Sequence, residues 1–124
     1  MKGIVITTEN EISVQDFGEP LYKTVGAAVG GGIEIVHPKL LEHPYCMIVD
    51  DEGLLKNYPL NMVGSFLYGT LEHGCPIVGT IVFMKEGFYN GEPDIVGLTD
   101  EEIEYLSTKL PKIFNLRGDT NNDR

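Results

Sequence analysis

Basic residues are scarce in this chain of 124 residues, which has 9 Lys and Arg against 19 Asp and Glu and a formal net charge of -10. A protein that coats DNA or RNA needs a basic face to neutralise phosphates, so this composition excludes that class. The same deficit argues against adhesion to an anionic membrane surface. It leaves open a small phosphate-bearing ligand, because a pocket needs only a few well-placed cations.

Cysteine and long apolar segments are also scarce. Cys46 and Cys75 are the only cysteines, and both lie in apolar runs, which predicts reduced, buried thiols and no disulfide framework. No stretch approaches the roughly 20 apolar residues of a membrane span, and the first residues lack the features of a signal peptide. We therefore expect a cytoplasmic protein. It should hold no metal, since His37, His43 and His73 share no metal-ligand spacing.

The length and the hydrophobic content of 42% are those of one globular domain. We expect residues 1–115 to form a single ligand-binding domain and residues 116–124 to form a polar, flexible tail. Apolar patterns predict strands at residues 2–7, 12–17, 33–37, 45–49, 76–84 and 95–98. Helical spacing predicts helices over residues 21–29, 62–73 and 100–110. The predicted fold class is α+β, with a mixed, mainly antiparallel sheet of five or six strands and two or three helices.

Local signals fix several element ends. Gly30-Gly31-Gly32 predicts the end of the first helix, and Asn61 is a predicted N-cap of the second. Thr99 and Glu102 form a predicted capping box at the last helix, which we expect Pro111 to break or kink. The segment 86–93, rich in Gly, Asn and aromatics, is predicted to be a loop.

The strongest enzyme signal is the run Tyr68-Gly69-Thr70-Leu71, which resembles the signature of the γ-glutamylcyclotransferase-like family. In that family the run leaves a strand near the N-terminus and is followed by a catalytic glutamate. Here it begins late in the chain, on a predicted helix, so this enzyme is kept as an alternative. No Ser-His-Asp or Cys-His-Asn arrangement is supported, which favours a binding protein.

The second half of the chain carries a candidate ligand platform. Phe83 and Tyr89 offer aromatic faces on which a purine can stack, a contact worth ~1–3 kcal/mol per base. Asn90 can donate to and accept from a base edge. Lysines supply positive charge in an otherwise acidic chain. The candidate ligand-binding residues are Phe83, Tyr89, Asn90, Lys56, Lys109 and Lys112.

A series of short segments in a fixed order carries a second resemblance. They are His37-Pro38-Lys39, Met47-Ile48-Val49-Asp50-Asp51-Glu52-Gly53, Pro59-Leu60-Asn61, Leu67-Tyr68-Gly69, Pro76-Ile77-Val78-Gly79 and Leu98-Thr99-Asp100-Glu101-Glu102. The series resembles small phage and mobile-element proteins of an uncharacterised domain family. It is also similar to the phage Thoeris anti-defence sponge proteins of the first type.

This resemblance implies a non-enzymatic sponge that acts in the cytoplasm of the infected bacterial host. Such proteins bind cyclic ADP-ribose isomers made by TIR-domain enzymes without cleaving them, and so inhibit Thoeris defence. Some members of that family also bind cyclic oligonucleotides at a separate site, which leaves a second site open for this chain. The resemblance further implies no cofactor and a homo-oligomer built from dimers into hexamers. A phage inhibitor that binds a host protein through its acidic surface is a further alternative.

In the sponge family an aromatic residue stacks on adenine, an asparagine reads it, and arginines contact the pyrophosphate. Phe83 and Asn90 match the first two roles by type and approximate place. The only arginines here are Arg117 and Arg124, so Lys56 and Lys109 would have to replace the family's arginines. A lysine is a point charge that lacks the bidentate fork of arginine.

Overall fold

The computed structural model describes residues 1–113, 117 and 118. The elements in chain order are β1 (Lys2–Ile6), β2 (Glu11–Asp16), α1 (Leu21–Val29), β3 (Ile33–Val36), β4 (Tyr45–Asp50), α2 (Met62–Tyr68), α3 (Thr70–His73), β5 (Ile81–Tyr89), β6 (Glu92–Val96), α4 (Asp100–Ile113) and β7 (Arg117–Gly118). The predicted end of the domain at residue 115, and most of the predicted tail, lie outside the described residues.

The strands form one sheet in the order β3-β4-β5-β1-β2-β7. Strand β6 pairs with the C-terminal part of β5, residues 85–89. The pairings among β1 to β6 are antiparallel, and the two-residue strand β7 pairs with β2 in parallel. The fold is therefore α+β with a mixed, mainly antiparallel sheet, as predicted. In the described part of the chain the helices are α1, α2, α4 and the single turn α3.

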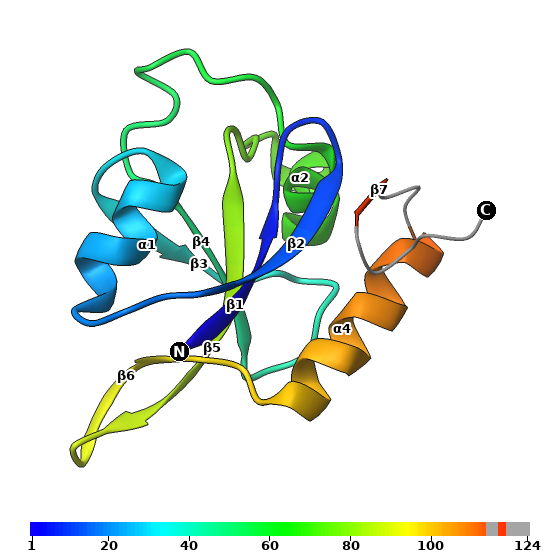
Figure 1. Cartoon of the computed structure of the whole chain (residues 1–124). Coiled ribbons are helices and arrows are strands. Elements are labelled where there is room, and N and C mark those ends of the chain that lie inside the picture. Colours follow the sequence, from blue (N-terminus) through cyan, green and yellow to red (C-terminus); the bar gives the residue numbers. More distant parts are fainter. Residues whose placement is uncertain (114–116, 119–124) are drawn as a thin grey trace.

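Helices cover both faces of the sheet, with α1 on one face and α2 and α4 on the other (Figure 1). Side chains alternate between these faces along the central strands because successive residues of a strand point to opposite sides. In β5, Phe83 packs in the cluster with α2 and α4, whereas Val82 packs in the cluster with α1. One nine-residue helix covers less of the sheet than two helices do, so part of the α1 face remains open.

The predicted helix ends are confirmed where side-chain caps hold them. The backbone N–H of Gly64 donates to Asn61 Oδ1 at 2.9 Å, at the start of α2. At α4, the N–H of Glu102 donates to Thr99 Oγ1 at 3.1 Å, and the N–H of Thr99 donates to Glu102 Oε1 at 2.8 Å. Helix α4 continues through Pro111 to Ile113, so the predicted break at Pro111 is wrong. Among the described residues, no helix has the length and apolar character needed to cross a membrane.

The segment after residue 76 is the main correction to the predicted fold. The strand predicted at 76–84 begins only at Ile81, because Gly79 adopts a φ of +81° that interrupts extended backbone. The loop predicted at 86–93 is instead the end of β5, a turn and the start of β6. Asn90 and Gly91 have φ values of +54° and +80° and form the two-residue turn of this hairpin. The hairpin projects beyond the rest of the sheet (Figure 1).

Candidate functional site

The open part of the α1 face forms a cavity of about 490 Å³ between α1, β3 and the β5–β6 hairpin. We call it the tyrosine pocket, because Tyr22 of α1 and Tyr89 of β5 both line it. Ile48 and Ile95, which are buried, form part of its apolar floor. Tyr22 is 67% exposed and Tyr89 is 39% exposed, so both rings are accessible from solvent. The volume is in the range of about 300–1,000 Å³ that small-molecule sites occupy.

The polar groups of the tyrosine pocket are mainly acidic. Glu19 and Asp94 line it beside the two tyrosines. The hydroxyl of Tyr89 donates to Glu19 Oε2 at 2.8 Å, and this bond to a carboxylate raises the pKa of Tyr89. The phenol therefore remains protonated at neutral pH and holds the Glu19 side chain against the hairpin.

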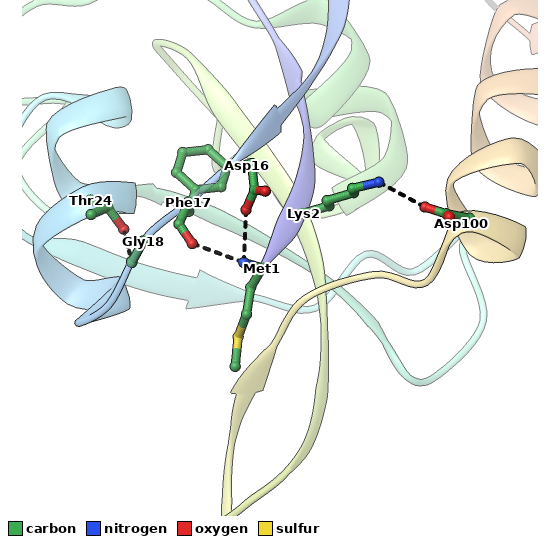
Figure 2. Close-up of polar contacts among 7 residues, drawn as sticks. All are labelled: Met1, Lys2, Asp16, Phe17, Gly18, Thr24 and Asp100. Carbon is green, nitrogen blue, oxygen red and sulfur yellow. Dashed lines mark hydrogen bonds and ion pairs between the residues drawn. The ribbon is translucent and has the colours of Figure 1, made fainter.

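The residues that precede Glu19 are held by contacts from the N-terminus and from α1 (Figure 2). The Met1 ammonium donates to Asp16 Oδ1 and to the carbonyl of Phe17, both at 2.9 Å. The hydroxyl of Thr24 donates to the carbonyl of Gly18 at 2.7 Å. Met1 itself lines the tyrosine pocket, so these contacts place the N-terminus, the β2–α1 connection and α1 around one cavity.

A second hollow of about 560 Å³ adjoins the tyrosine pocket and shares Ile35, Asp94 and Ile95 with it. His43 and Glu86 also line this hollow. Glu86 contacts two histidines, with His37 Nε2 at 2.8 Å from Oε2 and His43 Nε2 at 3.7 Å from Oε1. Within the described residues, no group of His, Cys, Asp and Glu has the arrangement of a metal site.

Comparison with protein families matches residues 1–111 to a family described as a domain of unknown function, DUF3846. The chain belongs to the DUF3846 family. A search of curated proteins gave no match, and a search of solved structures gave none either. The predicted membership in a small family of uncharacterised domains is therefore confirmed at the level of the family.

In this DUF3846 domain, Tyr89 is the predicted ligand-binding residue that lines the tyrosine pocket. Asn90 lies at the exposed tip of the hairpin, where it supplies the left-handed backbone conformation of the turn. Phe83 is 0% exposed and belongs to the core beneath α2 and α4. Its ring has no face available to a ligand, so the stacking role predicted for Phe83 does not fit the structure.

The predicted cations of the DUF3846 domain lie apart and are already paired. Lys56 Nζ donates to Asp50 Oδ2 at 2.8 Å and to the carbonyl of Gly30 at 3.0 Å. Lys109 Nζ lies 3.5 Å from Glu42 Oε1 and donates to the hydroxyl of Tyr105 at 3.0 Å. The side chain of Lys112 lies outside the described residues. The predicted residues therefore do not form one site.

Among the polar and aromatic residues of the tyrosine pocket, reasoning from sequence missed Glu19, Tyr22 and Asp94. Tyr22 is an aromatic residue on the solvent side of a predicted helix, and Glu19 and Asp94 lie next to Pro20 and Pro93 in predicted irregular segments. The Asn-Gly pair at residues 90 and 91 is the signal that would have found Asp94. An Asn-Gly pair is typical of the two-residue turn of a hairpin, because both residues readily adopt positive φ.

The Cys46 thiol and the run that begins at Tyr68 are the next candidates for catalytic chemistry, and their positions in the structure do not favour it. The Cys46 thiol is buried, and burial raises its pKa to about 12, so it is not a nucleophile at neutral pH. Tyr68 is the last residue of α2, and Gly69 ends that helix in a left-handed conformation. The run that resembles the cyclotransferase signature thus spans the end of α2 and the start of α3, whereas in that enzyme family the run leaves a strand.

Proposed function

We propose that this DUF3846 protein binds a cyclic ADP-ribose isomer made by a TIR-domain enzyme and sequesters it without cleavage. The observation that carries the proposal is the tyrosine pocket, with its two accessible rings above an apolar floor. A purine can stack on either ring, and base stacking on an aromatic side chain is worth ~1–3 kcal/mol. By lowering the free concentration of this signal, a phage protein would inhibit Thoeris defence in the infected host.

The chemistry of the pocket supports binding more than conversion. Among the described residues, the side chains that line it include carboxylates and phenols, but no Ser, Thr, Cys, His or Lys. Nucleophilic catalysis needs an activated side chain next to a general base, and these lining residues provide no such pair. We therefore expect the protein to release the ligand chemically unchanged.

The exposure of the pocket supports a homo-oligomer as part of the same proposal. Tyr22 is more than half exposed, so one chain covers only one side of a bound nucleotide. A ligand of this size is normally buried over most of its surface. A second copy placed over the pocket would enclose the remaining side and add lysine or arginine side chains, none of which is among the described residues that line the pocket of one chain.

The test is a calorimetric titration of cyclic ADP-ribose isomers into the full chain, followed by heat denaturation and chromatography of the released ligand. We expect binding at micromolar protein, recovery of intact ligand, and a loss of about tenfold or more in affinity for Tyr89→Ala. A cleaved product would identify an enzyme, and the absence of binding by any isomer would refute the proposal.

Tyr105 provides a matched control for Tyr89. It is 41% exposed, compared with 39% for Tyr89, and its hydroxyl also donates to a glutamate, Glu42 Oε2, at 2.7 Å. It lies on α4, beside Lys109 and on the opposite face of the sheet. Tyr105→Ala should leave binding unchanged. If Tyr105→Ala abolishes binding while Tyr89→Ala does not, the nucleotide site is at α4 near Lys109 and the tyrosine pocket is not involved.

A further inference from the structure

The charges around the tyrosine pocket disfavour a diphosphate inside it. Glu19 and Asp94 are the ionisable side chains with a charge at neutral pH among the lining residues, and both are negative. Met1 also lines the pocket, and the Asp16 carboxylate contacts its ammonium group at 2.9 Å and balances the charge of that group. Two like charges repel, and the net charge of -10 adds to this repulsion.

The same groups favour a positively charged ring. The face of an aromatic ring carries partial negative charge and attracts cations within about 6 Å, and aromatic residues recognise organic cations in this way. Tyr22 and Tyr89 are accessible, and the two carboxylates lie beside them. The apolar floor at Ile48 and Ile95 accepts the flat body of such a ligand. The pocket thus combines negative charge, aromatic faces and an apolar base.

We propose that the tyrosine pocket selects a positively charged heterocycle, namely a purine alkylated on its six-membered ring. This inference rests on the proposed function and identifies the part of the ligand that occupies the tyrosine pocket. An adenine that is glycosylated at ring nitrogen N1 as well as at N9 carries a positive charge at neutral pH. Isomers with this linkage should therefore bind more tightly than isomers whose adenine is neutral, with the diphosphate directed toward solvent or a second copy.

The experiment uses three small probes on the full chain. They are 1-methyladenosine, which is cationic at neutral pH, adenosine, which is neutral, and inorganic pyrophosphate. We expect 1-methyladenosine to bind about tenfold more tightly than adenosine, and pyrophosphate not to compete with it. Raising the salt concentration from 0.1 to 1 M should weaken the binding of 1-methyladenosine and leave that of adenosine unchanged, because salt screens charges at an open site.

Variants identify the groups responsible for the selection. Glu19→Gln and Asp94→Asn should each reduce the preference for 1-methyladenosine to about threefold or less, with little effect on adenosine. Glu104→Gln removes an exposed carboxylate on α4, outside the pocket, and should keep the full preference. Equal melting temperatures of the variants and the wild type would show that each is folded.

The outcomes separate this inference from the proposed function. Equal affinity for the two nucleosides, no binding of either, or competition by pyrophosphate would overturn the inference. If 1-methyladenosine is preferred but no cyclic ADP-ribose isomer binds, the charge selection is supported and the sponge function is refuted. If neutral and charged isomers bind equally well, the sponge function is supported and the charge selection is refuted.

Discussion

Asn61 is a buried residue whose replacement should reveal how α2 is attached to the sheet. Its side chain is 0% exposed and makes three hydrogen bonds. Its Oδ1 accepts from the N–H of Gly64 and caps the helix, and its Nδ2 donates to the carbonyls of Ile6 at 3.1 Å and Gly79 at 2.8 Å. One side chain therefore joins the start of α2, the end of β1 and the backbone that precedes β5.

The cost of Asn61→Ala follows from these bonds. Loss of an N-cap costs about 1 kcal/mol, and each buried carbonyl that loses its donor costs about 1 kcal/mol or more. We expect the free energy of unfolding to fall by about 3 kcal/mol. For a domain of this size that corresponds to a decrease of roughly 12 °C in melting temperature, at ~4 °C per kcal/mol.

Urea denaturation measures this change, and Thr99→Ala is the matched control. Thr99 is also an N-cap residue, at α4, but it is exposed and its hydroxyl accepts only the cap bond from Glu102 among the contacts described above. It should cost about 1 kcal/mol. If Asn61→Ala is no more destabilising than Thr99→Ala, the two bonds from Nδ2 contribute nothing and the reasoning is refuted.

Two further predictions concern titratable groups. The hydrogen bond from Lys56 lowers the pKa of Asp50, so this pair should stabilise the folded state fully above about pH 4 and lose its effect as the pH falls through the lowered pKa. The stability difference between wild type and Asp50→Asn should therefore shrink between pH 5 and pH 2 in denaturant titrations, and a constant difference would contradict the assignment. With a pKa of about 12, Cys46 should resist alkylation at pH 8 in the folded protein while the exposed Cys75 reacts, and mass spectrometry should find both modified in denaturant. Rapid modification of Cys46 in the native state would show that its thiol is accessible.

The features predicted correctly from sequence are those set by neighbouring residues. The bond between Thr99 and Glu102 spans three positions, so its residue types and spacing were sufficient to predict the start of α4. The cap at Asn61 was predicted for the same reason. Its two bonds to Ile6 and Gly79 were not, because they join residues 55 and 18 positions apart.

The candidate site was harder to predict because burial depends on distant elements. Phe83 and Tyr89 are both aromatic residues of β5, yet one is in the core and the other lines the pocket. The difference arises because Phe83 packs against α2 and α4, whereas Tyr89 adjoins the turn of the β5–β6 hairpin, which projects beyond the rest of the sheet (Figure 1). Likewise, the sequence shows that Lys109 is positively charged. It does not show that Glu42 pairs with this lysine, because the two residues are 67 positions apart.

The tyrosine pocket takes its wall from five separate stretches of the chain, between Met1 and Ile95. The unfolded chain does not bring these stretches together, so a ligand that fills the pocket binds the folded state alone. At a concentration one hundred times its Kd, such a ligand raises the free energy of unfolding by about 2.7 kcal/mol. Binding of a ligand in the pocket should therefore raise the melting temperature of the protein. A collection of unlabelled nucleotides can be screened by measuring this increase in a single experiment.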